Sequence, residues 1–246
     1  MHYRIIADYH VHSDMANKKP LGIIYKHAKS SIEENANTAI KRGLKEIAIT
    51  DHGFTHIYGM SKKNYPATRE IIDNLNFKYR DNNIEFRILL GVEANIISSK
   101  GEIDVDEDII EYLDLICVGY HPGSITIRNV KRNYMRTVGR VLENYDVAIL
   151  NHPKYKVDID VTELGEMASR TNTAIELNRK HDEDFTVEEI RILKEKGVIF
   201  SFGSDSHKHD AIGRFGKVTE LAAKAGLTND DIVNADGEAH NRLKLL

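Results

Sequence analysis

The chain has 246 residues, of which 41% are hydrophobic and 29% charged, proportions typical of a globular protein with a large core. Its formal net charge of −4 provides no overall basic surface, so nucleic acid is not expected as the main partner. No apolar run approaches the length of a membrane span, and a strand is expected close to Met1, which leaves no room for a signal peptide. The single cysteine, Cys117, fits a reducing compartment. We therefore expect a cytoplasmic protein without a membrane partner.

Strands and helices are predicted to alternate along the chain. The helices have clear start and stop signals: capping boxes begin at Ser31 and Thr186, and Gly43 and Gly197 fit helix ends. A longer helix is predicted over 129–145, and the acidic cluster 104–108 is interpreted as the solvated start of a helix over 109–113. The expected strands are continuously apolar, which indicates a sheet covered by helices. They lie at 3–11, 46–50, 86–93, 113–120, 147–151, 174–178 and 198–203.

Seven such units in 246 residues leave about 35 residues for each strand and helix, close to what a βα unit needs. Because no linker rich in Pro, Gly or Ser divides the chain, one domain is expected over residues 1–246. The predicted fold class is α/β, a distorted seven-stranded TIM-like barrel. An open doubly wound sheet fits less well, because it would gather its ligands at one switch point instead of at nearly every strand end.

Side chains of the metal-ligand type end most of these strands. In the first strand, the period of two places Asp8, His10 and His12 on one face, toward the barrel interior, where the Asp8 carboxylate is expected to orient the two imidazoles. Glu93 follows a run of apolar residues, where a carboxylate is costly to bury unless it is paired or metal-bound. Packing needs none of these groups, so the pattern predicts a metal-dependent hydrolase. The strand-ending residues are Asp8, His10, His12, Asp51, His52, Glu93, His121, His152, Asp205 and His207.

Four more polar residues follow strand ends and are expected to contact the substrate. As a group they would offer positive charge and hydrogen bonds to a phosphate, although each one alone also fits a solvated surface residue. They are His56, Arg179, His181 and Arg214.

In order, spacing and strand context, the motifs resemble those of the polymerase and histidinol phosphatase (PHP) domain family. The resemblance covers essentially the whole chain. It implies a distorted seven-stranded barrel of the PHP type with a centre of two or three divalent ions. The mixed nitrogen and oxygen ligands suit Zn, Mn or Fe and do not choose among them. The motifs are Asp8-Tyr9-His10-Val11-His12, Thr50-Asp51-His52-Gly53, Glu93, His121, His152 and Ser204-Asp205-Ser206-His207.

The resemblance also implies a ligand set for each ion. Glu93 would be shared by the first two ions, and the catalytic roles would fall to Glu93, Asp205 and His207. The sets are His10, His12, Glu93 and Asp205 for the first ion, Glu93, His121 and His152 for the second, and His52 and His207 with one further His for the third.

The further ligand of the third ion is expected to be His27. Compact members of the family have a His where Lys18 stands in this chain. We therefore interpret the segment 17–26 as containing a loop insertion that moves the ligand to His27. The alternative is that His27 is an ordinary surface residue.

The leading functional hypothesis is a metal-dependent phosphoesterase that hydrolyses a small phosphorylated metabolite, a phosphomonoester, with a metal-activated hydroxide. One alternative is a phosphodiesterase or 3′-5′ exonuclease acting on nucleic acid. The other is a metal-binding PHP module without catalytic activity.

Overall fold

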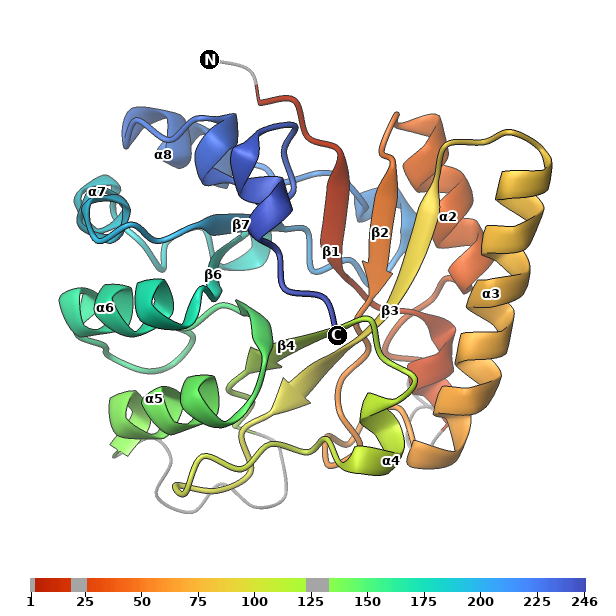
Figure 1. Ribbon diagram of the computed structural model, residues 1–246, viewed down its shortest axis with the longest axis horizontal. Helices are drawn as coiled ribbons and strands as arrows, with labels where there is room; N and C mark the ends of the chain where they lie inside the picture. The colour runs from red at the N-terminus through yellow and green to blue at the C-terminus, as the bar shows by residue number, and fades with distance from the viewer. Residues whose placement is uncertain (1–2, 19–25, 123–132) are drawn as a thin grey trace.

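The computed structural model describes residues 3–18, 26–122 and 133–246. Seven strands form one parallel sheet in the order of the sequence, and helices surround them (Figure 1). The strands are β1 (Ala7–Val11), β2 (Glu46–Ile49), β3 (Arg87–Asn95), β4 (Leu115–Gly119), β5 (Val147–Leu150), β6 (Ala174–Asn178) and β7 (Phe200–Gly203). The α-helices are α2 (Ile32–Lys41), α3 (Tyr65–Asp81), α4 (Glu107–Ile110), α5 (Tyr134–Asn144), α6 (Val161–Thr171), α7 (Val187–Glu195) and α8 (Val218–Lys224).

The sheet curls until β1 meets the segment that follows β7. Val11 and Ser206 form a parallel bridge. The backbone N–H of His12 donates to the Ser206 oxygen at 2.8 Å, and that of Ser206 donates to the His10 oxygen at 3.1 Å. The sheet is thus a nearly closed (β/α)7 barrel, which confirms the predicted fold class. The carboxyl ends of all seven strands face one rim.

Near the end of the barrel opposite this rim, the side chain of Asn234 joins the two edge strands, β1 and β7. Its Nδ2 donates to the backbone oxygens of Ala7 at 3.0 Å and Phe202 at 2.9 Å, and its Oδ1 accepts from the Phe202 N–H at 2.9 Å. Asn234 thus provides hydrogen-bond partners for backbone groups of β1 and β7 that would otherwise be unpaired at the seam.

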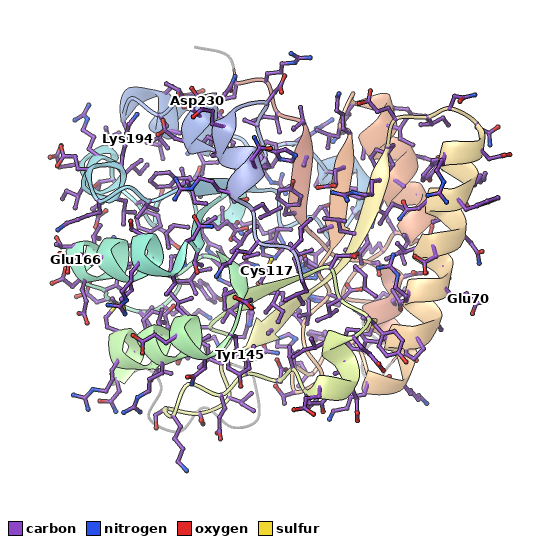
Figure 2. The ribbon with its side chains drawn as sticks, in the orientation of Figure 1. Glu70, Cys117, Tyr145, Glu166, Lys194 and Asp230 are labelled. Carbon is purple, nitrogen blue, oxygen red and sulfur yellow. The ribbon has the colours of Figure 1, made fainter. Side chains whose placement is uncertain are left out.

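The core has two parts. A large apolar cluster lies between the sheet and the helices, and a smaller cluster fills the barrel interior. Cys117 is fully buried in the interior cluster and lies among the strands in Figure 2, whereas Glu70 and Lys194 lie on outer helices. Small side chains suit the narrow interior of a barrel with few strands, and four alanines supply them: Ala7, Ala48, Ala148 and Ala174.

The helix signals in the sequence are confirmed. The Ser31 hydroxyl accepts from the backbone of Glu34, whose carboxylate reaches back to the Ser31 N–H, and the second capping box at Thr186 is complete as well. Gly43 and Gly197, which follow α2 and α7, have φ values of 76° and 79°, a conformation that favours glycine. No helix in the described residues is long and apolar enough to cross a membrane.

The interpretation of the acidic cluster is wrong for Asp104. Its side chain is not solvated but 1% exposed. It accepts hydrogen bonds from the N–H and Nδ2 of Asn95, both at 2.6 Å, and from the N–H and Oγ1 of Thr55 at 2.9 and 2.7 Å. Burial raises the pKa of Asp104, although these hydrogen bonds oppose the shift. Asp104 therefore ties the end of β3 to the loop after β2.

Two helix boundaries also differ from the prediction. The short helix α4 begins at Glu107, two residues before the predicted start. Part of the helix predicted over 129–145 lies outside the described residues, and α5 begins at Tyr134.

Candidate metal centre

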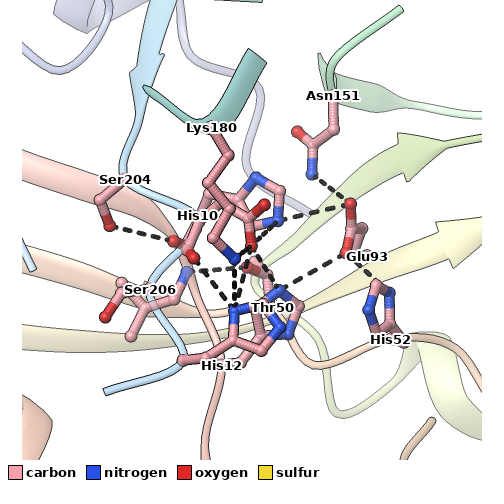
Figure 3. Close-up of polar contacts among 12 residues, drawn as sticks. His10, His12, Thr50, His52, Glu93, Asn151, Lys180, Ser204 and Ser206 are labelled. Atoms are coloured by element: carbon pink, nitrogen blue, oxygen red, sulfur yellow. Dashed lines mark hydrogen bonds and ion pairs between the residues drawn. The ribbon is translucent and has the colours of Figure 1, made fainter. Parts of the chain in front are cut away.

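The end of β1 directs two imidazoles at the centre of the rim. His10 and His12 are 2% and 0% exposed. The Nε2 atom of His10 lies 3.4 Å from Glu93 Oε1, and that of His12 lies 3.6 Å from Glu93 Oε2 and 3.4 Å from Asp205 Oδ1. Figure 3 shows His10, His12, His52 and Glu93 pointing toward one another, the first two from the end of β1 and the others from the ends of β2 and β3. Both rings of β1 therefore lie where they can share a cation, as predicted.

The prediction that Asp8 orients these two rings is wrong, because β1 has a register shift between Asp8 and Val11. The Asp8 carboxylate does not orient the rings but accepts from the backbone N–H of Gly213 at 2.8 Å.

Glu93, at the end of β3, occupies the middle of this group and is fully buried. Its Oε1 lies 2.9 Å from His152 Nε2 and 3.3 Å from His121 Nε2, and its Oε2 lies 2.7 Å from His52 Nδ1. Burial alone would raise the pKa of Glu93, but the charges of His10, His52 and His121 outweigh burial and hold it well below its usual value. The carboxylate stays charged and faces candidate ligands from several strands, as a bridging ligand would.

Within the described residues, four groups of side chains bring ligand atoms within 4.8 Å of one another. These groups share more residues with one another than do the three ligand sets expected from the sequence. His12 approaches the predicted third set as well as the first, and His52 also approaches Glu93 and His121. The groups are His12, His27, His52 and His207; His10, Glu93 and His152; His10, His12 and Asp205; and His52, Glu93 and His121.

Several buried atoms in these groups lack a hydrogen-bond partner among the described residues. Buried polar atoms are nearly always satisfied, so the arrangement fits a position for cations. The opposite ring nitrogens are held by protein groups: Glu176 Oε1 is 2.6 Å from His10 Nδ1, and Asn95 Oδ1 is 2.8 Å from His121 Nδ1. Metal-binding histidines are oriented in this manner. The atoms without a partner in hydrogen-bond geometry include His10 Nε2, His12 Nε2, His52 Nδ1, His121 Nε2 and Glu93 Oε2. His52 Nδ1 and Glu93 Oε2 are 2.7 Å apart but are not aligned for a hydrogen bond.

The backbone around the site has a glycine where side chains converge and two residues other than glycine with positive φ values. A Cβ on Gly119 would lie 2.7 Å from His121 Cε1 and 3.1 Å from Glu93 Oε1, so a glycine leaves space where these groups converge. His152 and Asp205 have φ values of 29° and 48°. Such strained conformations of residues other than glycine cluster at functional sites. Together with a mixed set of imidazole and carboxylate donors, these features fit divalent Zn, Mn or Fe.

His27, the ligand expected from sequence register, is directed into the rim. Its Nε2 lies 2.8 Å from His207 Nε2, and its ring stacks on Tyr58 with centroids 4.7 Å apart. Burial lowers the pKa of His27 to about 2, with contributions from His12 and His207. The imidazole is therefore neutral, which is the form that binds a metal. Residues 19–25 of the proposed insertion lie outside the described residues.

We expect His27→Ala to weaken binding of one ion, to leave the others bound, and to lower the rate by about a hundredfold or more, because a cation near the leaving oxygen is worth a few kcal/mol. Elemental analysis and hydrolysis rates test this. His209→Ala is the control, since His209 is an exposed rim histidine whose Nδ1 lies 3.0 Å from Ser30 Oγ. Unchanged metal content and rate in His27→Ala would show that His27 is not a ligand.

A cavity of about 180 Å³ opens above the ligands. Besides the candidate metal ligands, its described lining residues are Tyr155, Lys180 and His181. The rings of Tyr155 and His181 form one wall, with centroids 4.6 Å apart. The barrel rim thus offers a small polar space directly over the centre.

The four residues expected to contact substrate have different environments. His181 lines the cavity, and the ring of His56 lies 4.1 Å from that of His52, between centroids. Arg179 and Arg214 are not among the described lining residues. Instead, Arg179 donates its Nε to a backbone oxygen after β7 at 3.2 Å, and Arg214 is exposed.

Sequence reasoning missed three residues of the site: Tyr155, Glu176 and Lys180. Glu176 is a carboxylate inside an apolar strand. The same pattern identified Glu93, so it could have identified Glu176 as well. Lys180 lies between Arg179 and His181, which were both predicted to contact the substrate. The conformation of the turn Arg179–His181 directs Lys180 and His181, but not Arg179, into the cavity, and residue spacing does not reveal that.

Comparisons with known proteins agree with this geometry. The family model for the PHP domain matches residues 8–211. A protein named probable phosphatase from Thermoanaerobacter sp. (strain X514) is 30% identical over 247 residues, which cover 95% of this chain and 91% of that protein. The DNA polymerase/3′-5′ exonuclease PolX of Bacillus subtilis (strain 168) is 28% identical over 94% of this chain and 39% of its own length.

Among solved structures, histidinol phosphate phosphatase from Lactococcus lactis, in complex with zinc, L-histidinol and phosphate, has a TM-score of 0.62 and 19% identity. The alignment covers 90% of this chain and 94% of that one, which supports the fold. The extent of the family match and the 30% identity to a relative over nearly all of the chain confirm the resemblance found in the sequence. The chain belongs to the PHP domain family.

Proposed function

We propose that the chain hydrolyses a small phosphomonoester with water activated by two or three divalent ions. The coarser assignment follows from the comparisons: by its family and its relatives, the chain is a metal-dependent phosphatase of the PHP type. The observation that carries the finer proposal is Glu93, a buried carboxylate that faces ligand nitrogens from several strands below a small open cavity. We place the enzyme in the cytoplasm, which fits the free, buried thiol of Cys117.

The residues of the chain supply orientation and charge. Glu176 and Asn95 each hold one ring nitrogen of His10 and His121, so that the other nitrogen faces the centre. When bound, the ions would lower the pKa of an attacking water and offset the charge on the phosphate oxygens. Burial raises the pKa of the Cys117 thiol well above its usual value, and its place in the barrel interior keeps it from the substrate. The proposed nucleophile is therefore water.

The size of the cavity supports a terminal phosphate group as the substrate moiety. Pockets for whole drug-sized ligands hold about 300–1,000 Å³, whereas this space is about 180 Å³. A phosphoryl group with a small alcohol fits such a space, and a larger leaving group would extend into solvent. The likeness to the exonuclease PolX makes phosphodiester cleavage the second candidate, but the net charge of −4 does not favour an anionic polymer.

We expect the ion-loaded chain to hydrolyse p-nitrophenyl phosphate at least about tenfold faster than bis(p-nitrophenyl) phosphate. The reason is that a dianion interacts more strongly with clustered cations than a monoanion does. Rates for both esters, measured with Zn, Mn and Fe(II) in turn, test the proposal. Faster cleavage of the diester would favour the phosphodiesterase, and no cleavage of either ester with any ion would favour a non-catalytic module.

A further inference from the structure

Lys180 reaches the candidate metal centre from the turn after β6 (Figure 3). The side chain of Asn178 fixes this turn: its Oδ1 accepts from the Lys180 N–H at 2.8 Å, and its Nδ2 donates to Glu176 Oε2 at 3.0 Å. The Lys180 Nζ lies 3.0 Å from Asp205 Oδ1 and 2.8 Å from His207 Nδ1. The backbone of Lys180 is therefore anchored to the carboxylate that orients His10, while its ammonium group touches two candidate ligands.

The contact with His207 requires one particular tautomer of its ring. An ammonium group only donates hydrogen bonds, so Nδ1 must accept and the ring hydrogen must be on Nε2, which faces His27 Nε2 at 2.8 Å. A ring that binds an ion through Nε2 carries its hydrogen on Nδ1 instead. The backbone oxygen of Asp205, 3.0 Å from Nδ1, is placed to accept that hydrogen. The hydrogen bond between Lys180 and His207 and an ion on His207 Nε2 thus exclude one another.

We propose that Lys180 binds the phosphate of the substrate. With an ion on Nε2, His207 would no longer accept from Lys180, and Nζ would be free to donate to a non-bridging oxygen of a dianionic phosphomonoester. Lys180 is the one lysine or arginine among the described lining residues of the cavity, and its side chain is 38% exposed, so it can change partners without leaving a buried position. This inference rests on the proposed function and adds a substrate-binding residue to it.

The competing explanation is that Lys180 only holds Asp205 and His207 in place. The two explanations predict opposite effects on ion binding. If Lys180 holds the ligands, its removal loosens them and ions are lost. If Lys180 competes with an ion for His207, its removal leaves ion affinity unchanged or raises it, because a competing contact and a positive charge disappear together.

The test compares Lys180→Met, Lys180→Arg and Lys208→Met, the last being an exposed lysine next to His207 that is not among the described lining residues. Ions per chain and ion affinity are measured first. The affinity of the loaded protein for inorganic phosphate is then measured by calorimetry. We expect Lys180→Met to keep its ions, to bind phosphate about tenfold to a hundredfold more weakly, and to show a parallel rise in KM. Lys180→Arg should recover part of the affinity, and Lys208→Met should match the wild type.

Loss of ions from Lys180→Met would overturn the proposal in favour of a holding role. Full ion content with unchanged phosphate affinity would overturn it as well, because Lys180 would then not contact phosphate. In both cases the wild-type protein still binds phosphate and hydrolyses the ester, so the proposed function stands. A loaded wild-type protein that binds no phosphate and cleaves no ester would overturn the proposed function, and this inference with it.

Discussion

Removal of divalent ions is expected to abolish the phosphatase activity, and chain purified without exposure to chelator should carry two to three transition-metal ions. The reason is the set of buried nitrogen and oxygen atoms around Glu93 that have no hydrogen-bond partner among the described residues. The carboxylates of Glu93 and Asp205 both lie within 3.8 Å of the Nε2 atoms of His10 and His12, so ligand atoms of opposite kinds are gathered in a small volume. Elemental analysis, followed by activity before and after chelation and after return of each metal, measures the effect.

The ion-free protein should also be less stable. Ions that bind only the folded state add about 4 kcal/mol of stability when present at a thousand times their dissociation constant. Chelation should therefore lower the Tm, and return of the metal should restore both Tm and activity. Fewer than one ion per chain in protein never exposed to chelator would contradict the metal centre.

The affinity for ions should fall as the pH falls. Burial alone would lower the pKa of His10, but the charges of Glu176, Glu93 and Asp205 outweigh burial and raise it well above its usual value in the ion-free protein. A proton on His10 therefore takes the place of an ion. Ion binding must displace this proton, so the apparent affinity rises with pH until His10 is neutral without the ion. A titration at several pH values measures this dependence.

The sequence predicted those features that depend on short-range periodicity. The continuous apolar runs reflect strands covered by helices, and the polar residue that ends each run marks the rim, since parallel strands in a barrel all point the same way. His10 and His12 lie on one face because side chains alternate along a strand. Capping boxes depend on three-residue spacing, so Ser31 and Thr186 were sufficient to locate two helix starts.

The remaining features depend on contacts between distant segments. Asp104 has the spacing of a solvated helix start, yet Asn95 and Thr55 surround it only after β2 and β3 are side by side. Asn234 joins β1 to β7 across the seam, a contact between residues more than two hundred positions apart in the case of Ala7. Lys180, and not its neighbour Arg179, lines the cavity because a tight turn rotates the side chains there. Periodicity contains no information about these partners.

Substitution of Glu93 by glutamine is expected to lower turnover by at least about a thousandfold while the fold survives. The amide has nearly the size of the carboxylate, so the packing at the end of β3 is preserved. However, it carries no charge, and one of its two terminal atoms is a hydrogen-bond donor. That NH2 group would face an imidazole nitrogen or a cation, since one carboxylate oxygen of Glu93 lies toward His152 and His121 and the other toward His52. The variant would therefore lack the carboxylate that we expect to bridge two cations.

Three measurements separate this effect from unfolding. Circular dichroism and Tm of the ion-free proteins should be similar for Glu93→Gln and wild type, whereas ion content should fall in the variant. The matched control is Glu102→Gln: Glu102 lies after the same strand, is exposed, and accepts a hydrogen bond from Ser98 Oγ at 2.6 Å, so its loss should leave rate and ion content unchanged. A Glu93→Gln variant with full ion content and wild-type rates would show that the negative charge at the centre of the rim is not what holds the ions, and the assignment of Glu93 as the bridging ligand would be wrong.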